Sequence, residues 1–135
     1  ARRSRVVKTG YCTLVDDCYN ANPTSDRAAI DSLASLSGRH VCILGDMLEM
    51  GGNAPELHRS VGEYAAAHGV DLVITQGELA KYIAEGAGTA GAHYLDRASL
   101  LAALPELLHE RDVGLVKASH GAHFEEISEA VKQLS

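Results

Sequence analysis

Short runs of apolar residues recur along this chain, and helical patterns separate most of them. Each run is brief and apolar throughout, which predicts a buried strand. We expect strands at residues 12–15, 40–44, 71–75, 93–95 and 113–116. Apolar strands that alternate with helices are typical of a parallel sheet covered on both faces. The chain is thus predicted to be an α/β three-layer sandwich, with a mostly parallel sheet and helices on both faces.

Apolar residues at helical spacing place helices between these strands. We expect them at residues 25–36, 53–68 and 78–85, after Asp96, and from about Phe124 onward. Asn53 and Glu56 form a capping-box pattern at the start of the second helix. Asp96 is expected to cap the fourth helix, and Pro105 to kink or weaken its middle. Residues 6–15 predict a hairpin that leads into the first strand.

Length and charge limit what the chain can do. At 135 residues it can form one domain with a substantial core. Its formal net charge of −6 argues against a nucleic-acid partner, whose phosphates require a basic face. The sequence has no apolar run of about 18 residues and no secretory signal pattern, so we expect a cytoplasmic protein without membrane contact. Its three cysteines, Cys12, Cys18 and Cys42, are then expected to be reduced thiols.

The first residues are predicted to lie outside the α/β domain. Arg2, Arg3 and Arg5 have no aromatic neighbours and suit a solvated tail better than an arm that binds RNA or a membrane. The sequence does not begin with Met, and we expect it to be a piece of a longer protein. We therefore expect residues 1–11 to be a segment from the junction with a preceding domain, and residues 12–135 to be the domain itself.

Polar clusters follow several of the predicted strands. They occupy residues 16–23, 45–52, 76–77 and 117–121. Ligands of a doubly wound sheet bind outside the carboxyl ends of its strands, so we expect these clusters to meet at one edge. Asn and Asp are also common turn residues, and any single cluster could be only a connection. Together, their acids, amides, lysine, hydroxyl and imidazole favour a polar, zwitterionic or phosphorylated ligand.

Other candidate motifs carry less information. His120 and His123 could share a helix face, but no third ligand has suitable spacing, so we expect no metal site. Cys18 has no base beside it in the sequence and is expected to be a small buried or half-buried residue rather than a nucleophile. Neither G-x-x-x-x-G-K-[ST] nor G-x-G-x-x-G occurs. The chain alone therefore has no recognised means of holding a triphosphate.

Three stretches of the sequence resemble the Mur ligases. Residues 16–25 read D-D-C-Y-N-A-N-P-T-S and resemble a signature in the third domain of that family. Residues 44–51, L-G-D-M-L-E-M-G, resemble its second conserved stretch, and His58 with V-G-E at 61–63 matches the continuation. V-K-A-S at 116–119 resembles its last loop. The likeness spans nearly the whole chain and is closest to the members that join D-alanyl-D-alanine to a UDP-linked muramoyl tripeptide.

The resemblance implies a cytoplasmic, three-domain ligase of peptidoglycan synthesis, of which this chain is the Rossmann-like third domain. The other domains would hold the UDP-sugar substrate, and ATP with Mg²⁺ on a P-loop. In the family, ATP phosphorylates the peptide carboxylate, and the amine of D-alanyl-D-alanine then attacks the acyl phosphate. No catalytic residue and no metal ligand is implied for this domain. The isolated chain is expected to be inactive and to bind no cofactor tightly.

The resemblance also implies residues that contact two ligands. Four are expected to face the adenine and ribose of ATP: Asp17, Tyr19, Asn20 and Asn22. Six are expected to face the dipeptide: Asp46, Met47, Glu49, Lys117, Ser119 and His120. A lysine and a hydroxyl suit the terminal carboxylate of the dipeptide, and an acid in the loop suits its amine. Gln76 is a further candidate. Many relatives have arginine where this chain has His120, and an imidazole cannot form a bidentate clamp on a carboxylate.

Two other functions fit the same residues. Related ligases, such as those that add glutamate to folates, have similar third domains. The stretches N-A-N-P and G-D-M-x-E favour the D-alanyl-D-alanine-adding members over them. A free-standing ligand-binding module of flavodoxin-like shape is the second alternative, and it predicts that this chain alone binds a ligand at micromolar concentration or below. The fold alone does not distinguish an enzyme domain from a binding module.

Overall fold

The structure of the chain is a computed structural model that describes residues 5–135. Within these residues, a six-stranded sheet has the order β1-β2-β6-β3-β4-β5. Its strands are β1 (Arg5–Lys8), β2 (Thr13–Asp17), β3 (His40–Leu44), β4 (Leu72–Gln76), β5 (Gly91–Tyr94) and β6 (Val113–Lys117). Strand β1 pairs with β2 as an antiparallel hairpin, and the other neighbouring pairs are parallel. The predicted hairpin and mostly parallel sheet are confirmed.

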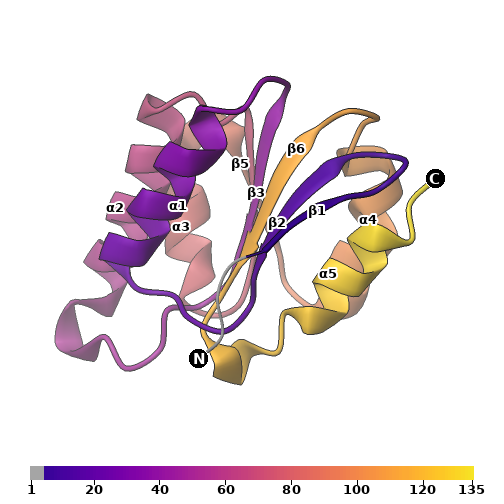
Figure 1. Cartoon of the computed structure of the whole chain (residues 1–135). Helices are drawn as coiled ribbons and strands as arrows, with labels where there is room; N and C mark the ends of the chain where they lie inside the picture. The colour runs from indigo at the N-terminus through magenta and orange to yellow at the C-terminus, as the bar shows by residue number, and fades with distance from the viewer. Residues whose placement is uncertain (1–4) are drawn as a thin grey trace.

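Helices cover both faces of the sheet and give the predicted three layers (Figure 1). They are α1 (Pro23–Ala34), α2 (Ala54–Ala67), α3 (Ala80–Ala87), α4 (Arg97–Leu107) and α5 (Glu125–Lys132). Helices α1, α2 and α3 lie on one face, and α4 and α5 lie on the other. Each face buries its own apolar cluster, with Leu33 and Ile83 in one and Leu104 and Ile127 in the other. This burial on both sides explains why the central strands are apolar throughout.

The last strand of the chain, β6, lies between β2 and β3 in the middle of the sheet. Its register aligns Lys117 with Asp17 of β2 on one side and with Leu44 of β3 on the other. The three strands therefore end at the same level. Consequently, the loops that follow β2, β3 and β6 meet at the carboxyl edge of the sheet, although β6 is distant from the other two in sequence.

The boundary between β2 and α1 differs from the prediction. Asp16 and Asp17, predicted to lie in a turn, are the last residues of β2 because their ladder with β6 continues to its end. Helix α1 begins at Pro23, earlier than predicted, and Asn22 is its N-cap. Asn22 Oδ1 accepts the Ser25 N–H at 2.8 Å, and Ser25 Oγ accepts the Asn22 N–H at 3.2 Å. This capping box satisfies backbone donors that the helix itself leaves unpaired.

The predictions for the later helices are confirmed in part. Asp96 caps α4, because its Oδ1 accepts the Ser99 N–H at 2.7 Å. The capping box predicted at Asn53 is wrong: Asn53 precedes α2, but its side chain makes no capping bond. A short 3₁₀ turn, η1 (Gly51–Asn53), leads into α2, and the backbone at Asn53 lacks the extended conformation that a capping side chain needs. Helix α4 includes Pro105 and continues to Leu107.

The predicted tail arginines Arg2 and Arg3 lie outside the described residues. The described part of the predicted junction segment, residues 5–11, includes β1, which is an edge strand of the sheet. Among the helices that the structure describes, none combines the length and the apolar character needed to cross a membrane.

Candidate functional site

A cavity of about 470 Å³ opens at the carboxyl edge of the sheet, where the loops after β2, β3 and β6 meet. Residues predicted to contact the nucleotide line one part of it: Tyr19, Asn20 and Asn22. Residues predicted to contact the acceptor line another part: Glu49, Ser119 and His120. Leu48 and Met50 are also in its walls; neither is among the six residues named for the acceptor, although both lie in the polar cluster at residues 45–52. Three residues of each predicted group therefore share one cavity, whereas Asp17, Asp46, Met47 and Lys117 do not line it.

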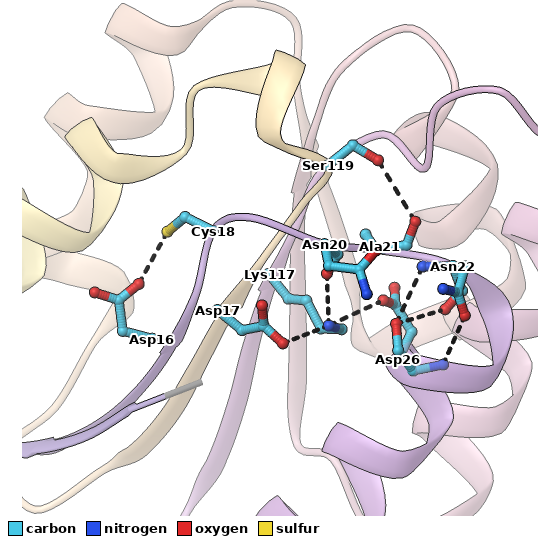
Figure 2. A network of polar contacts seen from close by, with 10 residues as sticks. Asp16, Asp17, Cys18, Asn20, Ala21, Asn22, Asp26, Lys117 and Ser119 are labelled. Atoms are coloured by element: carbon cyan, nitrogen blue, oxygen red, sulfur yellow. Dashed lines mark hydrogen bonds and ion pairs between the residues drawn. The ribbon is translucent and has the colours of Figure 1, made fainter. Parts of the chain in front are cut away.

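Ser119 connects the three loops that form this cavity. Its Oγ accepts the Leu48 N–H at 2.9 Å and donates to the Ala21 carbonyl at 3.5 Å, and Figure 2 shows the second contact. Its own backbone N–H donates to the Asp46 carbonyl at 3.1 Å. The loop after β6 is thus bound to the loop after β2 and to the loop after β3 through one residue.

Lys117 lies below the cavity that Ser119 lines. Its side chain is 1% exposed, and its ammonium donates to Asp17 Oδ2 at 2.5 Å and to the Asn20 carbonyl at 2.6 Å (Figure 2). A buried ammonium needs such partners, because burial without them is costly. Lys117 thereby holds the turn that presents Asn20 to the cavity. Its contact with the dipeptide stays a prediction.

Asp26 is a buried carboxylate beside Lys117 that the sequence did not reveal. The residue is 0% exposed, and within residues 5–135 neither carboxylate oxygen has a hydrogen-bond partner. Its Oδ1 lies 3.9 Å from Lys117 Nζ. Burial raises the pKa of Asp26 to about 7, against the opposite effect of the lysine charge. Aspartate is common in the first turn of a helix, so the sequence around Asp26 does not indicate that this residue is buried.

A second recess of about 270 Å³ lies on the α1 side of this ionic cluster. Ser25, Ala28, Ala29 and Ser32 of α1 line it together with residues of the cluster: Asp17, Asn20 and Lys117. Asn20 lines both this recess and the larger cavity. The turn after β2 therefore separates the two hollows.

Tyr19 and His120 form an aromatic wall of the larger cavity. Their rings are stacked, with centroids 5.1 Å apart and planes inclined by 19°. The His120 side chain is 64% exposed, and its Nδ1 lies 3.9 Å from Glu125 Oε2. The pair joins the loop after β2 to the loop after β6 and offers a flat surface to a ligand. An arginine at position 120 would offer a planar fork, whereas this imidazole offers one stacking face and single hydrogen bonds.

Two residues predicted to face the acceptor have partners within the domain. Asp46 Oδ1 accepts the backbone N–H groups of Leu79 at 3.0 Å and Ala80 at 2.8 Å, and so caps α3. The Met47 side chain is buried in the apolar cluster beneath α1, α2 and α3. Asp46 thus satisfies donors at a helix end and Met47 fills the core, and contact of either with the acceptor stays a prediction.

His58 of α2 supports the loop after β3 from within the protein. The side chain is buried, and its Nε2 accepts a hydrogen bond from the Met47 backbone N–H at 2.9 Å. Its Nδ1 lies 2.7 Å from the Ala54 carbonyl oxygen. The Met47 donor requires an unprotonated Nε2, so Nδ1 carries the proton. Burial lowers the pKa of His58, which keeps the ring neutral. Above this support, Glu49 adopts the left-handed backbone region, with φ of 62°, at the cavity wall.

Asp16 and Cys18 point to the side of β2 away from Lys117 (Figure 2). Asp16 Oδ1 accepts hydrogen bonds from Cys18 Sγ and Ser128 Oγ, each at 2.9 Å. Burial is the main cause that raises the pKa of Cys18 to about 12, and the Asp16 carboxylate adds to it. The thiol therefore stays protonated and is no nucleophile. The prediction that Cys18 is a small buried residue is confirmed.

The structure also locates two weaker candidates, a histidine pair considered as metal ligands and Gln76 considered as a ligand contact. The His120 and His123 rings lie 6.1 Å apart, and the described part of the chain holds no group of three or more His, Cys, Asp or Glu residues that could hold a metal ion. Gln76 does not line the cavity, and its Oε1 accepts a hydrogen bond from Arg97 Nε at 2.9 Å.

Comparison with known sequences gives a family match over most of the chain. A family model described as "Mur ligase, glutamate ligase domain" matches residues 2–120. The UDP-N-acetylmuramoyl-tripeptide–D-alanyl-D-alanine ligase of Escherichia coli (strain K12) is 38% identical over 122 residues, which cover 89% of this chain and 27% of that protein. The protein of the same name from Bacillus subtilis (strain 168) is 38% identical over 133 residues, covering 93% and 29%. The chain thus spans less than a third of these curated relatives.

Comparison with solved structures gives the same picture. A crystal structure of MurF from Acinetobacter baumannii superposes with a TM-score of 0.87 at 28% identity, over 96% of this chain and 30% of that one. MurF ligase from Thermotoga maritima in complex with ADP gives a TM-score of 0.79 at 25% identity, over 95% and 30%. The sheet and helices described above are therefore those of the matched parts of both structures.

Proposed function

The chain belongs to the Mur ligase family, and from that premise we propose that it is the C-terminal domain of a ligase that joins D-alanyl-D-alanine to UDP-N-acetylmuramoyl-tripeptide. Relatives with this name match most of the chain at 38% identity, which supports this acceptor over others. The observation that carries the proposal is the single cavity formed by the loops after β2, β3 and β6. In the proposed enzyme, a nucleotide and an amine acceptor meet there.

ATP is proposed to contact the loop after β2. The ADP in the Thermotoga maritima relative supports nucleotide binding in this family. The Tyr19 ring can stack on a base, and the carboxamides of Asn20 and Asn22 can pair with a purine edge or a ribose hydroxyl. Asn22 Oδ1 already accepts the Ser25 N–H, so its NH₂ group is the one offered to the nucleotide. Asp17 lines the second recess, beside the larger cavity. One of its oxygens accepts a hydrogen bond from Lys117, and the other is the proposed acceptor for a ribose hydroxyl.

The dipeptide is proposed to occupy the part of the cavity between the loops after β3 and β6. D-alanyl-D-alanine has an amine at one end and a carboxylate at the other. Glu49 offers a carboxylate that can orient the amine, and His120 offers a ring nitrogen to the dipeptide carboxylate. Ser119 can also hold that carboxylate if its single O–H leaves the Ala21 carbonyl, to which its contact is long, at 3.5 Å. These residues bind and orient the acceptor, and no bond-breaking step is assigned to them.

The phosphates of ATP, Mg²⁺ and the UDP-linked substrate are proposed to be held by preceding domains of the same protein. This sequence contains no phosphate-binding loop, and at the cavity edge Asp46 and one oxygen of Asp17 are engaged in the contacts described above. The proposed location is the bacterial cytoplasm, which supplies ATP. Closure of this domain over the others would bring the acceptor amine to the activated carboxylate.

The proposal is tested with the full-length ligase that carries this domain. With ATP, Mg²⁺ and the UDP-linked tripeptide, we expect phosphate release and a product heavier by the dipeptide when D-alanyl-D-alanine is added. Release with L-glutamate and not with the dipeptide would assign the chain to a glutamate-adding ligase. The isolated chain should release no phosphate. Calorimetry that finds micromolar or tighter binding of ATP or the dipeptide to the chain alone would instead favour the free-standing module.

A further inference from the structure

Arg97, the first residue of α4, makes four polar contacts outside the cavity. Its Nε donates to Gln76 Oε1 at 2.9 Å, at the end of β4. Its Nη2 donates to the Ala122 carbonyl and its Nη1 to the His123 carbonyl, both at 2.9 Å. Its Nη1 also lies 3.4 Å from Glu126 Oε1. The guanidinium therefore bridges the end of β4 and the segment that follows β6.

The segment that Arg97 holds carries part of the cavity wall. The 3₁₀ turn η3 (His120–Ala122) includes His120 and Gly121, which both line the cavity, and it ends at His123 in the left-handed conformation, with φ of 56°. A non-glycine residue in that conformation needs support from its surroundings. The two hydrogen bonds from Arg97 to the carbonyls of residues 122 and 123 supply such support where the backbone turns.

Arg97 also acts through Phe124. The guanidinium carbon lies 4.9 Å from the centre of the buried Phe124 ring, within the range of a cation–π contact. That ring packs so closely on Gly45 that a Cβ atom there would lie 2.5 Å from Phe124 Cζ. Gly45 is the first residue of the loop after β3. Through Phe124, the position of Arg97 is thus coupled to the start of a second cavity loop.

We propose that Arg97 is a positioning residue for the acceptor part of the cavity, which sets the place of His120 and Ser119 without touching the acceptor itself. This inference rests on the proposed function for the identity of the ligand. Arg97 is not among the residues that line the cavity. An arginine suits this place because its rigid planar group carries donors on three nitrogens, which reach acceptors on separate segments. A lysine also has three donors and can lie over a ring, but its donors share one nitrogen at the end of a flexible chain and cannot span the same acceptors.

The experiment compares Arg97→Gln and Arg97→Lys with a matched control, Arg59→Gln. Arg59 also pairs with a carboxylate, at 3.2 Å from Glu85, and lies over an aromatic ring, at 5.3 Å from that of Tyr82. In the full-length ligase, we expect both Arg97 variants to raise KM for D-alanyl-D-alanine ~10-fold or more, with KM for ATP within about twofold of wild type. The control should leave both constants unchanged.

A second measurement does not depend on the proposed function. The N–H groups of Ala122 and His123 are bound within the turn, to the carbonyls of Ser119 at 2.9 Å and His120 at 3.1 Å. In this chain, Arg97→Gln should speed hydrogen exchange of these two amides ~10-fold, relative to Arg59→Gln and to amides of α2. Equal exchange would overturn the proposal.

The two measurements separate the possible failures. If wild-type ligase gives no release with the dipeptide, the proposed function fails, and the exchange result alone decides whether Arg97 holds the turn. If wild type is active and both Arg97 variants keep its acceptor KM, the positioning role is refuted. A KM that rises for ATP and for the dipeptide alike would indicate a general loss of structure and would also refute it.

Discussion

Replacing Lys117 with Met keeps most of the length of the side chain and removes its charge. The change leaves Asp17 Oδ2 and the Asn20 carbonyl without their ammonium donor, and leaves Asp26 without the charge 3.9 Å away. Breaking a buried ion pair by removing one partner typically costs ~3–5 kcal/mol. Two features of this cluster reduce the cost. Asp17 is 17% exposed and can gain water. Asp26, with a pKa of about 7, can take up a proton. We therefore expect Lys117→Met to lower the free energy of unfolding by ~3 kcal/mol at pH 7.

Urea unfolding of this chain, followed by circular dichroism, measures that loss from the shift in midpoint at constant slope. Lys81→Met is the matched control, because Lys81 is exposed on α3, and it should change the free energy of unfolding by ~0.5 kcal/mol or less. Combining Lys117→Met with Asp26→Asn should cost less than the two single changes added together, because the two groups interact. A loss below ~1 kcal/mol for Lys117→Met, or strict additivity, would refute the argument that the buried charge holds this turn in place.

Three further predictions concern residues around the same edge and the helices beside it. The raised pKa of Asp26, about 7, means that the folded chain binds more protons than the unfolded chain between about pH 4 and 7, so stability falls as pH rises through that window. Between pH 5 and pH 8, the free energy of unfolding measured in urea should therefore fall less for Asp26→Asn than for wild type, by at least ~1 kcal/mol. The same pH dependence in both proteins would contradict this. Asn22→Ala removes the cap on α1 and should cost ~1 kcal/mol by the same assay, whereas Asn22→Asp should retain most of the stability; equal losses would argue against the cap. Gly62→Ala would place a Cβ atom 1.9 Å from the Ile83 carbonyl oxygen, so α2 and α3 must separate. A loss of ~2 kcal/mol or more is expected in thermal unfolding, and an unchanged Tm would show that the helices can adjust.

The alternation of apolar strands and helices was readable from the sequence because its signals are local. An apolar run of a few residues, or a helical spacing of leucines, is visible without knowledge of the rest of the chain. Cap prediction shows where local signals end. Asn22 and Asn53 both precede a helix, but only Asn22 caps one, since a 3₁₀ turn fixes the backbone at Asn53 in a different conformation. The residue type was the same, and the backbone geometry differed.

The candidate site shows the same limit. The polar clusters after the strands were correctly expected to meet, because parallel strands end at a common edge. Which side chains reach the cavity was not predictable in the same way. Met47 is in the core, Asp46 caps α3, and Lys117 is buried, although all three lie in those clusters. Their partners belong to other elements, so their own neighbours in sequence give no sign of the contact.

Local sequence patterns were sufficient for the succession of strands and helices, for the polar residues at the strand ends and, through motif resemblance, for the family. Tertiary structure decided that β6 lies between β2 and β3, which brings Lys117 to Asp17 across 100 positions of sequence. It also decided that the Asp26 carboxylate is buried without a hydrogen bond among residues 5–135 and that Arg97 donates to backbone carbonyls of the turn after β6. Secondary structure follows from patterns within a few residues, whereas the burial and pairing of a charge depend on groups that only the folded sheet brings together.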